Sequence, residues 1–166
     1  MISQNTIEQL QSQERGVHYI LGARLRSVKE IREKVLSHPG RYREVRGPKN
    51  KSDDPAPLQV KNVWIDGRRY VVCLNVDQAK KDRADREAIV ATLAEQLKRG
   101  DKSLVGNRGY RKYLKGGATH FEIDRRKIKT EARYDGKWVL RSDLDDFSAE
   151  DIGLGYKQLW MVEDCI

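Results

Sequence analysis

A tyrosine and a glutamate near the end of the chain are spaced for one face of a helix. Residues 148–166 have the apolar periodicity of an amphipathic helix, and at about 100° per residue Tyr156 and Glu163 fall within about 20° of each other. The same face carries Ile152, Leu159 and Trp160. A carboxylate on an apolar face is desolvated unless a metal ion or an arginine neutralises it. The spacing therefore indicates a ligand for Glu163. The alternative is that the helix frays after Trp160 and leaves Glu163 in water.

These residues also carry a family resemblance. The spacing Tyr156-x2-Leu159-x3-Glu163 resembles the Tyr-x2-Arg-x3-Glu signature of DDE transposases from bacterial insertion sequences, the group named after insertion sequence four. The wider string from Tyr156 to Glu163 is similar to the form found in one branch of that group. In that branch the second catalytic aspartate precedes Arg-Gly-Met-Ile-Ser, and this chain begins with Met1, Ile2 and Ser3. The resemblance covers the chain in order and implies that both catalytic aspartates of the family are absent from it.

The resemblance implies an α/β (α+β) fold with a partial RNase H-like catalytic core. In this group of transposases a largely β insertion separates the last core strand from the helix that bears the catalytic glutamate. Residues 1–40 would then supply part of the core as helix, strand and helix, and residues 41–141 would form the mixed, β-rich insertion. Residues 142–166 would form the C-terminal helix with the catalytic Glu position.

The resemblance also implies a metal-dependent reaction. Strand transfer proceeds by in-line displacement at a phosphodiester, with two divalent ions about 3.5–4 Å apart that activate the attacking oxygen and stabilise the leaving one. Glu163 would be the catalytic and metal-binding residue, and Mg²⁺ or Mn²⁺ would be the cofactor of the intact family member. Because the two aspartates are absent, we expect the chain alone to bind no ion stably and to cleave no DNA.

DNA contacts are expected at three further positions. Tyr156 and Lys157 would contact DNA phosphates beside the active site, and an equal alternative for Tyr156 is a place in the protein core. Trp138 could stack on an unpaired base, although a core role in a hairpin is favoured. Leu159 replaces the arginine of the signature, and Gly153 and Gly155 weaken the helix interior. Together with the tail 164–166, these departures suggest a frameshifted or decayed copy.

The composition favours a polyanionic partner. Charged residues make up 35% of the 166 residues, the net charge is +8 and the sequence pI is about 9.5, although such cations can simply be solvated. We therefore consider two functions. One is a fragment of a DNA transposase, inactive alone, whose partners are double-stranded DNA at transposon ends and a second copy or a full-length transposase. The other is a non-catalytic basic DNA-binding module that interferes with an intact transposase.

The location expected for either function is the bacterial cytoplasm, or the nucleoid when the protein is bound to DNA. The chain has no apolar run of about 18 residues and no charged-then-apolar N-terminus, so neither a membrane span nor a secretory signal is expected. The two cysteines, Cys73 and Cys165, have no paired Cys/His spacing, which argues against a zinc site and for reduced thiols.

Local patterns predict several elements. Ser27 and Glu30 form a capping-box pattern before a helix whose inner face is Val28, Ile31, Val35 and Leu36. Asp66-Gly67 predicts a tight hairpin between strands over 58–65 and 69–74, and Asp135-Gly136 predicts a second hairpin. The remaining predictions are a weak helix over 3–13, a short strand over 17–21, an exposed connection over 41–57 and a long surface helix over 77–99.

Other polar residues receive structural interpretations. The acids just before the final helix fit helix-start chemistry better than a metal site, and they are Asp143, Asp145, Asp146, Glu150 and Asp151. The charged clusters at 80–83 and 85–87 are typical of a solvated, self-paired helix face. Three histidines without partners fit packing or surface roles, and they are His18, His38 and His120. Four glycines indicate turns, and they are Gly106, Gly109, Gly116 and Gly117.

Overall fold

The hairpin predicted at Asp66-Gly67 lies at the centre of the fold. A computed structural model describes residues 8–9, 18–100, 112–116 and 121–163, with side chains placed up to residue 158 in the last range. Strands β3 (Leu58–Ile65) and β4 (Arg68–Leu74) pair antiparallel, with Val63 opposite Tyr70. Asp66 and Gly67 have φ angles of 49° and 72°, the positive values that a tight two-residue hairpin turn requires. The predicted hairpin is confirmed.

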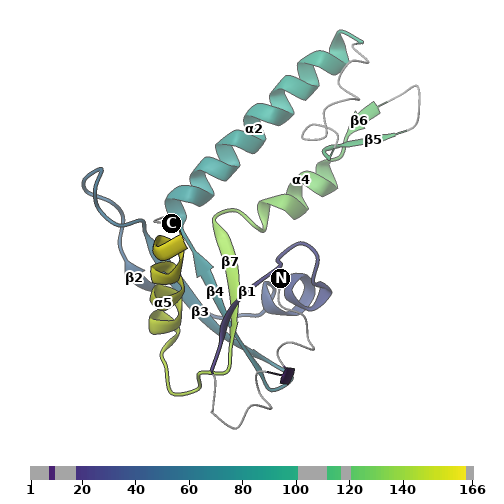
Figure 1. The fold of residues 1–166 in the computed structure, drawn as a ribbon. Coiled ribbons are helices and arrows are strands. Elements are labelled where there is room, and N and C mark those ends of the chain that lie inside the picture. The colour runs from purple at the N-terminus through teal and green to yellow at the C-terminus, as the bar shows by residue number, and fades with distance from the viewer. Residues whose placement is uncertain (1–7, 10–17, 101–111, 117–120, 164–166) are drawn as a thin grey trace. The chain divides into compact units, whose positions relative to one another are not determined.

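Three more strands complete an antiparallel sheet around this hairpin. They are β1 (Ile20–Ala23), β2 (Arg43–Arg46) and β7 (Lys137–Ser142), and the strand order is β1-β7-β4-β3-β2 (Figure 1). The fold is thus a mixed α+β arrangement with an antiparallel sheet. Strand β1 begins later than the strand predicted over 17–21. The prediction of an exposed connection over 41–57 is wrong in part, because β2 lies within it and pairs with β3.

Each face of the sheet has its own apolar core. Helix α5 (Ala149–Glu163) packs on β3, β4 and β7, and Figure 1 shows it lying across one face of the sheet. The core beneath α5 consists of Leu58, Val60, Val71, Cys73, Leu140, Ala149 and Ile152. The π-helix η1 (Ile31–Val35) belongs to the second core, which consists of Ile31, Val35, Val63, Tyr70, Val72 and Val139. The alternation of strand residues between two faces explains why one sheet supports both cores.

The helix predicted after Ser27 is present, but its start differs from the prediction. Helical residues begin at Lys29 and continue into η1. Glu30 makes no side-chain cap to η1, because its carboxylate accepts hydrogen bonds from Arg68 Nη2 at 3.1 Å and from the Tyr70 hydroxyl at 2.9 Å. Val28, predicted to face inward, is 39% exposed. The acid of the capping-box pattern is therefore used to hold η1 to β4.

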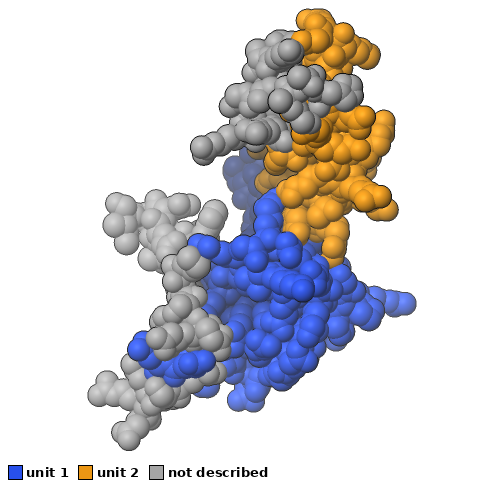
Figure 2. All heavy atoms as spheres, turned by 90° about the vertical axis from the view of Figure 1, so that its right-hand side faces the viewer, with its two compact units in different colours: residues 1–76, 137–166 blue, residues 77–136 orange. Residues whose placement is uncertain are grey.

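The chain divides into two compact units, coloured separately in Figure 2. Unit 1 consists of residues 1–76 and 137–166, and unit 2 consists of residues 77–136. The predicted domain limits at about 40 and 141 stay predictions. Unit 2 contains nearly all of α2 (Val76–Lys98), which confirms the predicted long helix, and Gly100 after it has a φ of 69°. It also contains β5 (Leu114–Gly116), β6 (Phe121–Ile123) and α4 (Arg125–Ala132).

The hairpin predicted at Asp135-Gly136 is wrong. Asp135 and Gly136 follow α4 and precede β7, so they form a helix-to-strand connection instead of a β-hairpin turn. The short helix α4 begins at Asp124, whose Oδ1 accepts a hydrogen bond from the Lys127 amide at 2.9 Å. The core of unit 2 forms where Leu93 of α2 and Tyr113 are buried against Ile89, Leu114 and Ile128.

Some predictions fall outside the described residues. They concern most of the helix over 3–13, of which only Glu8 and Gln9 are described as helical, together with Gly106, Gly109, Gly117, His120 and Cys165. Gly116 ends β5 with a φ of 131°. Within the described parts of the chain, no helix has the length and apolarity needed to span a membrane.

Candidate nucleic-acid interface

Helix α5, which carries the predicted site residues, begins at a serine cap. The Ser148 hydroxyl oxygen accepts a hydrogen bond from the Asp151 amide at 3.0 Å and donates to Asp151 Oδ2 at 2.6 Å. This is a capping arrangement, which supplies an acceptor for an amide that the first helical turn leaves unpaired. Another acid of the predicted cluster, Asp143, accepts from the Tyr19 amide at 2.8 Å and lies 3.7 Å from His18 Nδ1. Asp151 therefore has the helix-start role expected for it, whereas Asp143 instead ties the segment after β7 to the residues before β1.

Glycine allows α5 to lie close to the sheet. Ile152 is fully buried, and a Cβ added at Gly153 would lie 3.1 Å from Val60 Cγ1 and 3.6 Å from Cys73 Sγ. Such a contact is tighter than ordinary van der Waals packing, so a larger residue would push the helix outward. Gly153 lowers helix propensity, but it gains close packing in exchange. Its presence is thus explained by packing and does not indicate a decayed sequence.

Tyr156 lies on the inner side of α5 and reaches strand β1. It is partly buried against the core beneath α5, and a Cβ added at Gly22 would lie 2.5 Å from its hydroxyl oxygen. Gly22 therefore makes room for the tyrosine. The core position considered for Tyr156 is present, and its contact with DNA phosphate stays a prediction. Sequence reasoning missed Gly22, because no local pattern relates it to a residue more than 130 positions away.

Two residues predicted independently as DNA contacts lie together. Trp138 on β7 is partly buried against the core beneath α5, and Lys157 Nζ lies 5.4 Å from the centre of its indole ring. This distance is that of a cation–π contact. The indole Nε1 is buried and has no hydrogen-bond partner among the described residues. The packing role favoured for Trp138 is consistent with its position, and base stacking stays a prediction.

The surroundings of Lys157 are positively charged. Burial lowers the pKa of its ammonium group, and the nearby Arg46 guanidinium lowers it further. Burial also raises the pKa of the Cys73 thiol to about 12, so this neighbour is neutral at pH 7 and offers no counter-charge. No carboxylate forms an ion pair with Lys157 in the part of the chain that the structure describes. A half-buried cation without an acidic partner is a place where an anion is stabilised.

Glu163 is the last residue of α5, as the sequence predicts. Its side chain lies outside the described part of the structure, so its role as a metal ligand stays a prediction. Among the described residues, no three His, Cys, Asp or Glu side chains are grouped as metal ligands would be.

A cavity of about 430 Å³ opens beside the start of α5. It is lined by Gly40, Arg41, Arg43, Val60, Lys61, Asn62, Arg69, Ser148, Ala149 and Glu150. Four of these residues are cations and one is a carboxylate. Sequence reasoning missed this cavity, although one of its lining residues, Arg69, is a buried cation at the start of the apolar run of β4.

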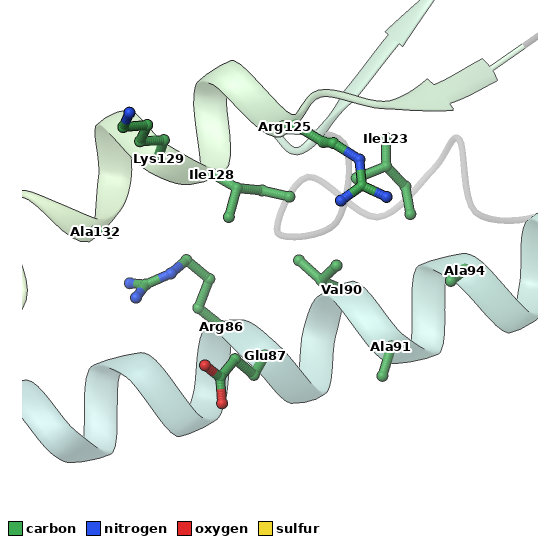
Figure 3. A pocket seen from close by; sticks show the side chains of 10 residues that line it. All are labelled: Arg86, Glu87, Val90, Ala91, Ala94, Ile123, Arg125, Ile128, Lys129 and Ala132. Atoms are coloured by element: carbon green, nitrogen blue, oxygen red, sulfur yellow. The ribbon is translucent and has the colours of Figure 1, made fainter.

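Unit 2 contains a second cavity, of about 550 Å³, between α2, β6 and α4. Figure 3 shows Val90 rising from α2 toward Ile128 of α4, with Arg125 reaching down from the other side. Arg86, at one end, donates two hydrogen bonds to Asp135, of which Nη2 to Oδ2 measures 2.6 Å, and this contact raises the pKa of the guanidinium. The prediction of a solvated face over 80–87 is therefore wrong for Arg86, which is 8% exposed.

Comparisons with known proteins identified no relative of this chain. No protein-family model matches the chain, and neither a curated protein nor a solved structure matches it.

Proposed function

We propose that this chain is a DNA-binding part of a DDE transposase of bacterial insertion sequences, the family that its Tyr156-to-Glu163 string resembles. In this proposal β1 and the residues before it belong to a partial RNase H-like core, and α5 is the helix that bears the catalytic glutamate. The antiparallel sheet beneath α5 holds this helix in place. Double-stranded DNA is the partner, and Glu163 is a ligand of Mg²⁺ or Mn²⁺ in the complete catalytic centre.

The environment of Lys157 is the observation that carries the proposal. Lys157 follows Tyr156 on α5, packs over Trp138 and lies near a second cation, Arg46. A backbone phosphate would supply the missing negative charge to this group, and such contacts dominate the affinity of proteins for DNA. The net charge of +8 favours the same class of partner.

Duplex binding tests the proposal. Fluorescence anisotropy with a labelled 20-base-pair duplex should show binding whose affinity falls steeply between about 50 and 200 mM salt, because neutralised phosphates release counterions. Lys157→Met keeps the aliphatic stem on Trp138 and should weaken binding and flatten the salt dependence. Lys98→Met is the matched control, since Lys98 is a 73% exposed cation in unit 2, paired with Glu95. Absence of binding at 50 mM salt, or equal effects of both variants, would contradict the proposal.

Catalysis by the chain alone is tested separately. Two-ion displacement needs several carboxylates to hold the ions, and Glu163 is the one position that the resemblance assigns. We expect no nicking or joining when the 166-residue chain is incubated with supercoiled plasmid and Mg²⁺ or Mn²⁺. Turnover that disappears in Glu163→Gln would show that the chain carries a complete catalytic centre, contrary to this expectation.

A further inference from the structure

Phe147 is a large apolar side chain on the surface of unit 1. It is 51% exposed and lies in the loop between β7 and α5, directly after the exposed residues Asp145 and Asp146. In the described parts of the chain, neither aspartate forms an ion pair or a hydrogen bond. A single exposed apolar residue is common on protein surfaces, but an aromatic side chain next to two such acids has the chemistry of an interface anchor. Its complement would be an apolar pocket with cations beside it.

The loop between β7 and α5 is held at both ends. Before it, the Leu144 amide donates a hydrogen bond to Ser142 Oγ at 3.1 Å, and the Leu144 carbonyl oxygen accepts one from Arg69 Nη1. After it, Ser148 begins α5 as the helix cap. Residues 145–147 therefore lie between two fixed points. A segment that is already in place loses less conformational entropy when it binds a partner.

The cavity of unit 2, between α2, β6 and α4, has this complementary lining. Its volume is about 550 Å³, which is ample for an aromatic ring. The apolar side chains that line it are Val90, Ala91, Ala94, Ile123, Ile128 and Ala132. Arg125 and Lys129 of α4 also line it, and both are exposed. Figure 3 shows Arg125 reaching into the space between the two helices, beside Val90 and Ile128. A guest in the cavity would therefore meet both apolar and cationic groups.

Three cations of α4 have no counter-charge in the part of the chain that the structure describes. The first turn of this helix contains Arg125, Arg126 and Lys127 and no acid. Cations at this end are unfavourable with the helix dipole, so the stability of α4 does not explain them. Lys127 lies 3.7 Å from Glu131. Among the described residues, Arg125, Arg126 and Lys129 form no ion pair. Exposed cations of α2 differ in this respect, because they pair with carboxylates: Lys80 with Asp77, Arg83 with Glu87 and Lys98 with Glu95.

We propose that the cavity of unit 2 binds residues 145–147 of a second copy of this chain. Phe147 enters the apolar lining, and Asp145 and Asp146 pair with the cations of α4. A nucleic-acid phosphate can also pair with these cations, but it would leave the apolar lining without an occupant. The acidic loop therefore accounts for more of the site. The inference goes beyond the proposed function and does not rest on DNA binding.

The proposed contact joins two different surfaces, since each molecule has one loop and one cavity of this kind. Two copies that exchange loops form a closed dimer, whereas one-way binding forms an open assembly. The charges at the border of the contact speed the encounter of the two copies, and salt screens them. Self-association should therefore weaken as the salt concentration rises.

Sedimentation velocity of the full chain tests the inference. We expect the average mass to rise with protein concentration. Phe147→Ser should weaken self-association about tenfold or more, as loss of a central interface residue commonly does. Val28→Ser is the matched control, because Val28 is another exposed apolar residue of unit 1, at 39%, and does not line the cavity. An unchanged protein that stays monomeric at every concentration, or equal effects of the two substitutions, would overturn the inference.

Reversed charges identify the two surfaces. One variant carries Asp145→Lys with Asp146→Lys, and the other carries Arg125→Asp with Lys129→Asp. All four residues are exposed, so circular dichroism should show the spectrum of the unchanged protein. Each variant alone opposes like charges and should stay monomeric, whereas an equal mixture should associate, because every loop can then meet a cavity of opposite charge. A mixture that stays monomeric would show that these surfaces do not bind each other.

Anisotropy with the same duplex separates a protein partner from a nucleic acid. If the unchanged protein stays monomeric while Arg125→Asp with Lys129→Asp weakens its binding to DNA, the cations of α4 form a nucleic-acid surface and the inference is wrong. Self-association that follows the expected pattern in a protein that does not bind DNA would support the inference and contradict the proposed function.

Discussion

The contact between Gly22 and Tyr156 joins strand β1 to helix α5. A methyl group at Gly22 would lie 2.5 Å from the Tyr156 hydroxyl oxygen, so the tyrosine side chain or one of the two elements has to shift. We expect Gly22→Ala to lower the free energy of unfolding by about 1–3 kcal/mol, as overpacking of a core commonly does. Urea denaturation measures the loss. In a Tyr156→Phe background the hydroxyl oxygen is gone, so the same substitution should be less harmful.

Gly155 provides the control for that experiment. A Cβ at Gly155 would meet Ile20 Cδ1 at 3.9 Å, which is an ordinary contact. Gly155→Ala should therefore leave the protein as stable as before, or stabilise it by up to about 1 kcal/mol through helix propensity. Similar losses in the Gly22 and Gly155 variants would show that close approach to Tyr156 is not the cause.

Two buried groups on β4 make the free energy of unfolding depend on pH in the alkaline range. Burial raises the pKa of Cys73 from 9.0 to about 12, and burial followed by the hydrogen bond to Glu30 raises the pKa of Tyr70 from 10.0 to about 12. Because both values lie above those of the unfolded chain, the folded state holds more protons between pH 9 and 12. The stability that these groups contribute is thus complete below about pH 9 and is lost as the pH rises toward 12.

The comparison with Cys73→Ala isolates one of these groups. The lowered pKa values of Lys61 and Lys157 act in the opposite direction, so the total change with pH is a sum of opposing contributions. Urea denaturation at pH 8.0 and at about pH 10.5 should show a steeper fall for the unchanged protein than for Cys73→Ala, by at most about 1.4 kcal/mol per pH unit. Parallel curves would mean that the thiol ionises as readily in the folded protein as in the unfolded chain.

At the scale of elements, the sequence predicts what depends on local signals. The β3–β4 hairpin, the long helix α2 and the terminal helix α5 all have a turn pair, a cap or an apolar period that is visible within about 20 residues. Strand β2 lacks such a signal because it has one apolar residue, and helix α4 has only the Asp124 cap, because it consists mainly of charged residues. Both are held by partners that lie elsewhere in the chain.

For the candidate interface, too, the sequence indicates single residues but not the contacts between them. Trp138 and Lys157 could be selected singly from their types and positions, but their contact depends on α5 packing over β7. Lys61 and Arg69 are strand residues next to apolar ones. A long cation at such a position commonly extends to the solvent, so the sequence does not indicate that they are buried. Only the pairing of β3 with β4 and the two cores show that both are buried, Lys61 on the η1 face of the sheet and Arg69 on the α5 face.

The ion pair between Arg86 and Asp135 stabilises unit 2. The two side chains are 9% and 16% exposed, and Asp82 adds a hydrogen bond from the Gly136 amide to its Oδ2 at 2.8 Å. Asp135→Asn keeps the shape but leaves the guanidinium uncompensated, so we expect unit 2 to lose about 3–5 kcal/mol. Hydrogen exchange of the α2 and α4 amides measures this loss.

An exposed pair on the same helix is the control for that change. Arg83 and Glu87 are 71% and 65% exposed, and their Nε–Oε1 distance is 2.8 Å. Glu87→Gln should change stability by less than about 1 kcal/mol, because solvent screens such pairs. Equal exchange rates in the Asp135 and Glu87 variants would show that burial does not strengthen the Arg86 pair.

At the scale of the whole molecule, unit 2 is inserted between two strands that already pair with each other. Leu74 at the end of β4 lies opposite Lys137 at the start of β7, and the intervening residues 77–136 form unit 2. Both apolar cores beneath the two sheet faces, and the pair of Lys157 with Trp138, consist of unit 1 residues. Unit 1 therefore has the components of an independent domain.

Replacing residues 75–136 with Asn-Gly tests this independence. Antiparallel strands in this register can be joined by a two-residue turn, and Asn-Gly is a preferred sequence for it. We expect the shortened chain to unfold cooperatively in urea and to bind duplex DNA with the salt dependence of the full protein. A longer glycine-serine linker should also permit folding, at a loss of about 0.6 kcal/mol for each doubling of its length. A shortened chain without a cooperative transition would show that the sheet of unit 1 needs unit 2 in order to form.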